Sequence, residues 1–244
     1  MSNIQEVKNS LIEGQTCIMG EEITIFLLDC SGSMCSGFDL RDYPEENWKH
    51  QDSKFQAMCD AAAKYANQRV KAASNGAKDR VGVITFGKGG AHTVFEPYNT
   101  NYQVMANKVC KITCGGSTPM AEAVEQAIKM SENYPTAFLR LVILSDGQPD
   151  SKPYVLEAVQ RAYEEYGLVT DTVGIGNKNY SDVDACPCGL DEQFLIKVSE
   201  LGGGKYTRCT NAEALSQLFL EIEQERALLI GKGVLLLGDG KDIK

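Results

Sequence analysis

The sequence predicts a three-layer α/β fold in which helices cover both faces of a mostly parallel central sheet. First, a short unbroken apolar run at 23–28 is followed by further largely apolar runs at 138–144 and 168–175, as expected of strands buried on both faces. Second, segments of helical periodicity alternate with these runs, which favours right-handed βαβ units. Third, a length of 244 residues is enough for one such domain with extensions.

The other elements follow in chain order. After the first strand comes a polar segment, and the first helix is expected at 53–74, where apolar residues have helical spacing. Strands at 80–86 and 92–98 flank a glycine-containing turn, which predicts a hairpin and hence one antiparallel edge strand. The remaining helices are expected at 102–110, 119–132, 153–166, 191–201 and from 211 to 222 or 229, and the last strand at 205–209.

We expect three regions along the chain: an N-terminal extension at 1–20, the α/β domain at 21–225 and a C-terminal tail at 226–244. Apolar spacing over 2–11 predicts a short amphipathic helix or, alternatively, a frayed terminus. In the tail, the apolar run 233–237 would dock on the domain or on a partner, or add an edge strand.

Oxygen-bearing side chains follow two of the predicted strands. Asp29, Ser31 and Ser33 come directly after the first strand and alternate along the chain, so their oxygens can converge on one point. Asp146 follows the strand at 138–144, at the end where ligands bind in open α/β sheets. A buried acid is costly without a partner, and oxygen ligands without thiolate or imidazole suit a hard divalent cation.

A third segment completes the pattern. Thr118 precedes Pro119, which is favourable as the first residue of a helix, so we expect the Thr118 hydroxyl at the N-cap. Gly115 and Gly116 are expected to serve the backbone shape of this loop, because no phosphate-binding motif accompanies them. Asp150 is expected to be an exposed loop acid or, alternatively, a group that supports the metal ligands.

The Asp-x-Ser-x-Ser motif at 29–33, with Thr118 and Asp146, resembles the metal-ion-dependent adhesion site of von Willebrand factor type A domains. All five positions of that pattern are present, in the usual order and separation. The resemblance implies a Rossmann-like three-layer fold and a non-enzymatic protein-binding module, similar to the stand-alone intracellular proteins of bacteria. It also implies a Mg²⁺ site, with Mn²⁺ or Ca²⁺ as alternatives. The implied ligands are Asp29, Ser31, Ser33, Thr118 and Asp146.

Three hydroxyl ligands and only two acids would leave a divalent cation with most of its charge. An open coordination position would then attract an Asp or Glu carboxylate of a partner protein. Loops at 35–52 and 176–190 are expected at the same edge of the sheet, where long loops are usually functional. Tyr43, Trp48 and Tyr180 are their candidate partner-binding aromatics, unless these loops pack on their own domain.

Three alternatives compete with this interpretation. Asp-Ser-Gly-Ser segments also form turns, although the presence of Thr118 and Asp146 disfavours that interpretation. A Mg²⁺-dependent phosphatase or phosphotransferase would use Asp29, but Ser31 stands where its second acid is needed, and neither histidine adjoins a motif. The third alternative is a structural subunit with an idle site.

Composition limits the function classes and the compartment. A net charge of −9 argues against binding to nucleic acid or to an anionic membrane surface. Nine cysteines, an odd number, without a signal-peptide-like leader predict a reducing compartment, the cytoplasm. Cys30, Cys59 and Cys110 are expected to be small buried hydrophobes. Cys186 and Cys188 lack the spacing of a zinc site and are expected to be a structural or surface thiol pair.

Overall fold

A computed structural model describes residues 22–39, 52–73, 80–177 and 189–232. In this part of the chain, six strands form one sheet in the order β3-β2-β1-β4-β5-β6. All neighbouring strands are parallel except β2 and β3, so the predicted mostly parallel sheet with one antiparallel edge strand is confirmed. The strands are β1 (Glu22–Cys30), β2 (Arg80–Gly87), β3 (Gly90–Phe95), β4 (Phe138–Ser145), β5 (Val169–Ile175) and β6 (Gly203–Cys209).

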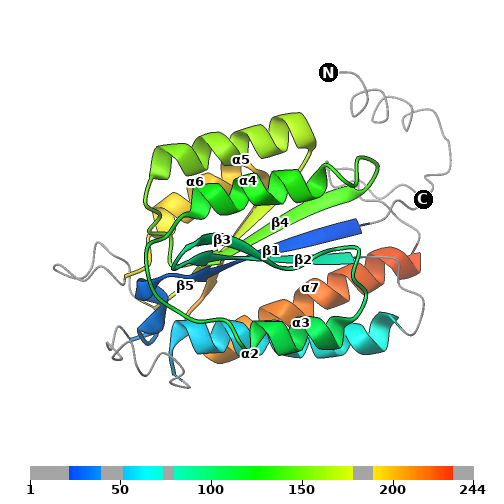
Figure 1. Cartoon of the computed structure of the whole chain (residues 1–244), viewed down its shortest axis with the longest axis horizontal. Coiled ribbons are helices and arrows are strands. Elements are labelled where there is room, and N and C mark those ends of the chain that lie inside the picture. The colour runs from blue at the N-terminus through cyan, green and yellow to red at the C-terminus, as the bar shows by residue number, and fades with distance from the viewer. Residues whose placement is uncertain (1–21, 40–51, 74–79, 178–188, 233–244) are drawn as a thin grey trace.

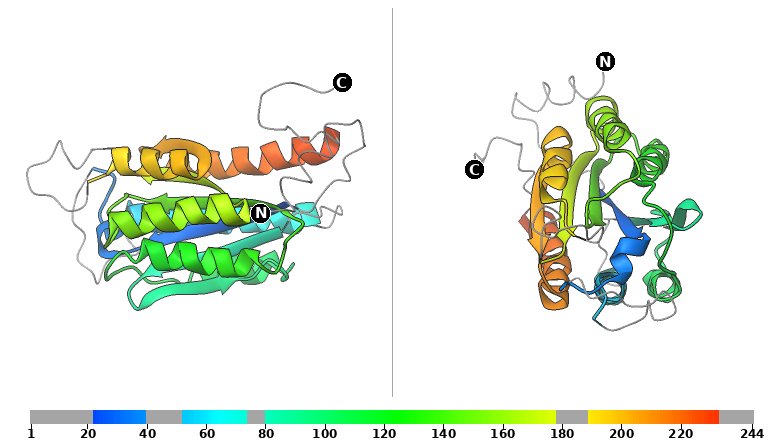
Figure 2. Two further views of the ribbon diagram at one scale, coloured as in Figure 1. Left: turned by 90° about the horizontal axis from the view of Figure 1, so that it is seen from above. Right: turned by 90° about the vertical axis from the view of Figure 1, so that its left-hand side faces the viewer.

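Helices cover both faces of the sheet, as predicted (Figure 1). Three of them pack on one face, namely α2 (Lys54–Ala73), α3 (Tyr102–Val109) and α7 (Ala212–Lys232). The other face carries α4 (Met120–Ser131), α5 (Lys152–Tyr166) and α6 (Glu192–Leu201). The right-hand view of Figure 2 looks along the strands and shows the sheet between these layers.

Strand β1 lies inside the sheet and explains why an unbroken apolar run is needed there. Successive side chains of a strand point to opposite faces, so every second residue of β1 enters the same core. Phe26 and Leu28 pack with α2, α3 and α7, whereas Ile25 and Leu27 pack with α4, α5 and α6. Each buried side chain of this kind stabilises the fold by roughly 1.5–3 kcal/mol.

The course of the chain reverses between β1 and β4. From β1 the chain passes through α2 to β2 on one side, and later through α4 to β4 on the other side of β1. In open α/β sheets such a reversal opens a crevice at the carboxyl ends of the two strands. In Figure 1 this edge lies at the left, where the loop after β1 and the start of α2 are found.

Two local details differ from the prediction. β3 starts at Gly90 because Lys88 and Gly89 alone form the turn of the hairpin, and Gly89 and Gly90 adopt φ values of 88° and 102°. A short 3-10 helix, η2 (Gly32–Cys35), directly follows β1 and was not expected. It makes the loop after β1 compact, with Met34 and Cys35 buried.

The last helix is longer than expected. α7 continues to Lys232, past the domain boundary expected at 225. The predicted helix at 2–11 and the apolar run at 233–237 lie outside the described residues. Of the helices in the described ranges, none combines the length and the apolar sequence needed to cross a membrane.

Candidate metal site at the carboxyl edge of the sheet

The loop after β1 and the loop before α4 are joined by two backbone hydrogen bonds. Gly32 N–H donates to the carbonyl of Gly116 (3.1 Å), and Gly115 N–H donates to the carbonyl of Cys30 (2.8 Å). Gly116 has a φ of 82°, and a Cβ at this position would lie 2.7 Å from the Cα of Lys88. Only glycine fits this close approach, in agreement with the backbone role predicted for it.

A disulfide between Cys35 and Cys114, 79 residues apart, links the same two loops. Their Cα atoms are 6.2 Å apart, a usual separation for a disulfide. Of the three cysteines expected to be buried, Cys30 and Cys59 are buried, but Cys110 is exposed. The prediction is wrong for Cys110 because this residue forms the C-cap of α3, beyond the helix face that packs on the core.

Ser31 and Ser33 bring their hydroxyl groups together. The two Oγ atoms are 3.2 Å apart. Ser31 has extended backbone torsions, as the alternating motif required, and is only 1% exposed, whereas Ser33 is half-buried. The pair therefore presents two neutral oxygen ligands at one point, reachable from the side of Ser33.

Asp29 is fully buried near the end of β1, and both of its carboxylate oxygens accept hydrogen bonds. Oδ1 accepts from Ser31 N–H (2.9 Å), and Oδ2 accepts from the hydroxyl of Ser145 (2.5 Å). Ser145 ends β4, and its Oγ accepts in turn from Gly147 N–H (2.9 Å). Burial and, second, the charge of Asp146 raise the pKa of Asp29 from 3.8 to about 7. The two predicted acids are thus close enough to interact electrostatically.

Asp146 is also fully buried, and its two oxygens have different surroundings. Oδ2 accepts from Lys54 Nζ at 2.9 Å, and the side chains of both residues have no exposed surface. Oδ1 is buried, and no polar atom of the described residues forms a hydrogen bond with it. A buried oxygen without a partner costs about 1–3 kcal/mol, and more when the group is charged. A cation is the natural partner for Oδ1.

Thr118 lies two residues after Gly116 and is 7% exposed. Asp150 holds its backbone: Thr118 N–H donates to Asp150 Oδ1 (2.8 Å), and Asp150 N–H donates to the Thr118 carbonyl (3.0 Å). The predicted N-cap role of Thr118 is wrong, because Pro119 is the N-cap of α4 and no side chain caps that helix. Asp150 is exposed, as expected, yet it also positions the loop that carries Thr118.

These residues fit a divalent cation. The structure brings Ser31 to Ser33 and Asp29 to Asp146, and it places Thr118 on a loop bonded to the loop after β1. Within the described ranges, no group of three or more His, Cys, Asp or Glu side chains could hold a metal ion, so a site here depends on hydroxyls. Carboxylate and hydroxyl oxygens are the ligands that Mg²⁺ takes, and the unpartnered Oδ1 of Asp146 provides a position for it.

Sequence reasoning assigned no role to Lys54 or to Ser145, although one signal was available. A lysine at the first position of a helix is unfavourable because it meets the positive end of the helix dipole, and Lys54 is the first residue of α2. The predicted partner-binding residues Tyr43, Trp48 and Tyr180 lie outside the described residues, as do Cys186 and Cys188.

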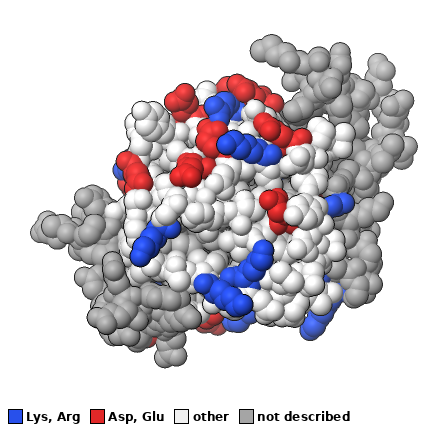
Figure 3. Space-filling view, in the orientation of Figure 1, with Lys and Arg blue, Asp and Glu red and all other residues white. Residues whose placement is uncertain are grey.

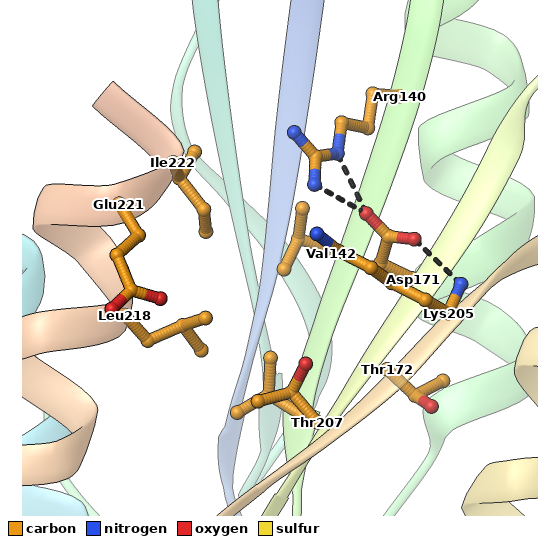
Figure 4. Close-up of a pocket in the computed structure, with 10 residues that line it drawn as sticks. Arg140, Val142, Asp171, Thr172, Lys205, Thr207, Leu218, Glu221 and Ile222 are labelled. Carbon is orange, nitrogen blue, oxygen red and sulfur yellow. Dashed lines mark hydrogen bonds and ion pairs between the residues drawn. The ribbon is translucent and has the colours of Figure 1, made fainter. Parts of the chain in front are cut away.

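A cavity of about 70 Å³ lies away from this site, near the amino ends of β4, β5 and β6 (Figure 4). Asp171 stands in its wall and accepts from Arg140 Nε (2.6 Å) and from the backbone N–H of Lys205 (2.8 Å). Glu221 of α7 lines the side facing these residues. Since both oxygens of Asp171 are engaged, we interpret this cluster as a structural ion pair between strands.

The fold and the site define the class of protein. The von Willebrand factor type A domain family matches residues 24–148, just over half of the chain. The chain belongs to this family. Domains of this family commonly mediate interactions between proteins and are generally interaction modules rather than enzymes.

Solved structures of low sequence identity share this fold. The chain is similar to the conserved hypothetical protein BatB from Bacteroides thetaiotaomicron, with a TM-score of 0.61 and 19% identity over 85% of this chain and 99% of that one. It is similar to the pilus adhesin SpaC from Lactobacillus rhamnosus GG, with a TM-score of 0.65 and 15% identity over 87% of this chain and 31% of that one. The manganese-loaded TRAP protein of Plasmodium vivax has a TM-score of 0.55 and 17% identity over 82% of this chain and 74% of that one. Among curated proteins, no sequence match was found.

Proposed function

We propose that this chain is a divalent-metal-dependent protein-binding module, in which a metal-ion-dependent adhesion site captures an acidic side chain of a partner protein. The proposal depends on one observation, the burial and incomplete hydrogen bonding of the Asp146 carboxylate. Its carboxylate is fully buried, and its Oδ1 has no hydrogen-bond partner among the described residues. The charge of Asp146 also acts on a second buried carboxylate, Asp29. Two buried acids in proximity favour a cation between them.

The hydroxyl-bearing and the acidic residues of the site would have different roles. Ser31, Ser33 and Thr118 would hold Mg²⁺ (or Mn²⁺ or Ca²⁺) through neutral hydroxyls, and Asp29 and Asp146 through carboxylates, directly or through water. A bound divalent cation supplies an electrophilic position for the carboxylate of a partner. Because hydroxyl ligands carry no charge, they leave that position strongly attractive to an anion.

The surface charge affects how a partner approaches. On the face shown in Figure 3, acidic side chains gather over α4 and α5, while several Lys and Arg side chains lie lower on the same face. With a net charge of −9, the protein as a whole repels an acidic partner at long range. Capture would therefore depend on attraction at short range, and moderate salt should speed association by screening the repulsion.

Two of the similar structures are described in terms that support this proposal. One is described as a pilus adhesin and another as manganese-loaded. A phosphatase or phosphotransferase that uses Asp29 gains no such support, because both oxygens of this fully buried carboxylate are engaged by Ser31 and Ser145. A nucleophilic carboxylate would need an oxygen exposed to the substrate.

The test is Mg²⁺ titration by calorimetry, followed by capture of partners from lysate with and without Mg²⁺. Thr118→Val removes the hydroxyl at nearly constant volume, and Thr118→Ser restores it. We expect Thr118→Val to weaken Mg²⁺ binding by about ten-fold or more and to lose the Mg²⁺-dependent partners, and Thr118→Ser to behave like the wild type. Asp29→Ala should lose binding as well.

Two results would overturn the proposal. One is a wild-type protein that binds neither Mg²⁺ nor Mn²⁺ nor Ca²⁺ at millimolar concentration. The other is partner capture that is the same with and without a chelator, which would favour a structural subunit with an idle site. We further propose the cytoplasm as the compartment, on the odd cysteine count. The Cys35–Cys114 disulfide argues against this compartment, because disulfides are rare in reducing surroundings, and cell fractionation decides between the two indications.

A further inference from the structure

A buried lysine stands behind the candidate metal site. Lys54 Nζ donates to Asp146 Oδ2 at 2.9 Å, and neither side chain is exposed. The start of α2 is held beside the loop after β1, because Lys54 N–H donates to the carbonyl of Ser36 (3.0 Å) and Ser53 pairs with Gly37 in an isolated β-bridge. The ammonium group therefore reaches the site from a fixed backbone.

Stability alone does not explain this ion pair. Removing a lysine and a carboxylate from water costs several kcal/mol per ion, and well-packed apolar residues of similar volume are often as stable or more stable. The position is also unfavourable, since Lys54 begins a helix and meets the positive end of its dipole. Burial of the charge and the position at the start of a helix both disfavour a lysine here, which indicates that Lys54 does more than stabilise the fold.

The geometry assigns Lys54 to one oxygen of Asp146 and leaves the other oxygen for a metal. Oδ2 is engaged by the ammonium, whereas Oδ1 has no partner among the described residues. The ammonium and a divalent cation would thus share one carboxylate from its two sides. Each of the two cations therefore weakens the attraction of the Asp146 carboxylate for the other cation.

The charges of the loaded site can be counted from the residues that the structure describes. Asp29 and Asp146 supply two negative charges, and Lys54 supplies one positive charge. With a divalent cation the cluster carries one net positive charge, which a single partner carboxylate neutralises. Without Lys54 the loaded cluster is neutral, and its attraction for a carboxylate is weaker.

We propose that Lys54 is a resident counter-cation of the metal site: it lowers the affinity for the metal, raises the affinity of the loaded site for a carboxylate, and stabilises the metal-free fold. The inference rests on the proposed function, because it concerns the same site. Lys54 acts through Asp146 and is a positioning residue.

The experiment compares Lys54→Met, which removes the charge at similar length, with Lys54→Arg, which keeps the charge. Calorimetry measures Mg²⁺ affinity, and a short Glu-containing peptide at saturating Mg²⁺ measures carboxylate affinity. We expect Lys54→Met to bind Mg²⁺ about ten-fold more tightly and the peptide about ten-fold more weakly than the wild type. Lys54→Arg should stay near the wild type in both. A purely structural Lys54 would shift both affinities in the same direction.

Thermal unfolding gives an independent readout. The metal-free melting temperature of Lys54→Met should fall, and Mg²⁺ should raise it by more than it raises that of the wild type, because Asp146 lacks its ammonium partner. Should Lys54→Met unfold without metal, recovery of the fold by Mg²⁺ supports the inference, and failure to recover at concentrations that saturate the wild type overturns it. Equal or weaker Mg²⁺ binding by a folded Lys54→Met also overturns it, with the proposed function intact. Absence of Mg²⁺ binding by the wild type would instead remove the proposed function itself.

Discussion

Cys35 and Cys114 form a disulfide that fastens the loop carrying Ser31 and Ser33 to the loop carrying Thr118. The three predicted hydroxyl ligands thus lie on two segments that are held together by one covalent bond. Two backbone hydrogen bonds join the same segments, so the covalent and the non-covalent contacts act on the same relative position. This arrangement predicts that the oxidation state of the two cysteines affects the site.

Reduction of this disulfide should weaken both the fold and metal binding. The bond closes a loop of 79 residues, so its loss should lower the free energy of unfolding by up to about 4 kcal/mol. Mg²⁺ affinity should fall as well, because the two loops lose a constraint. Urea unfolding and calorimetry with and without reductant measure the two effects. The Cys35→Ala/Cys114→Ala double variant should reproduce the reduced protein, and Cys110→Ala should resemble the wild type. Unchanged Mg²⁺ affinity after reduction would contradict this prediction.

The free thiols should differ in reactivity according to burial. Burial and, second, the charge of Glu221 raise the pKa of Cys209 from 9.0 to about 11, whereas Cys110 is exposed. The reactive form is the thiolate, so at pH 8 only about one Cys209 in a thousand is reactive. Iodoacetamide labelling followed by peptide mapping should modify Cys110 first, and labelling of Cys209 should rise as the pH approaches 11 or when the protein unfolds. Equal labelling rates at pH 8 in the folded protein would show that this assignment is wrong.

Loss of the Asp150 side chain should affect the site more than the fold. Asp150→Ala removes the acceptor for Thr118 N–H, so the loop that carries Thr118 loses part of its support. We expect Mg²⁺ affinity to fall by about 10–100-fold, the usual range for groups that orient metal ligands. Because Asp150 is exposed, the melting temperature should change little. Asp150→Asn keeps an acceptor oxygen and serves as the control. A wild-type Mg²⁺ affinity in Asp150→Ala would show that metal binding does not depend on the hydrogen bond from Thr118 N–H to Asp150.

Loss of the Arg140–Asp171 ion pair, at the other edge of the sheet, should affect the fold and leave the metal site unchanged. Asp171→Ala removes the acceptor of Arg140 Nε and of the Lys205 N–H, and we expect a loss of about 1–3 kcal/mol in the free energy of unfolding. Asp171→Asn retains an acceptor for the Lys205 N–H and should lose less. Mg²⁺ affinity measured on folded protein should be unchanged in both, since Asp171 lies near the amino end of β5. A change in Mg²⁺ affinity would mean that the two edges are coupled.

Most of the fold follows from patterns that are local in the sequence. The apolar run in β1 predicts burial on both faces, and the glycine-containing turn between β2 and β3 predicts the antiparallel edge. The last helix was expected to begin at residue 211, and Asn211 Oδ1 accepts from Ala214 N–H at 2.8 Å, directly before α7. Such signals depend on neighbours within a few residues, so they can be read without the tertiary structure.

The candidate site was predictable only in part. Its two acids and three hydroxyls stand in a recognisable order, and the strand ends place Asp29 and Asp146 at one edge of the sheet. The N-cap assignment of Thr118 failed because the chain turns through Pro119 and Asp150 holds the Thr118 backbone from 32 residues away. No pattern within a few residues predicts a contact between residues that far apart in the sequence.

The order of strands and helices, the alternation of β1 side chains between two cores and the oxygen-bearing residues at the strand ends all follow from the amino-acid sequence, because periodicity and turn chemistry are properties of short segments. The contacts of Lys54 with Asp146, 92 residues further along the chain, and of Cys35 with Cys114 became visible in the folded structure alone. These contacts arise because the chain reverses its course between β1 and β4, which brings distant segments to one edge of the sheet and leaves their buried charges to pair with each other.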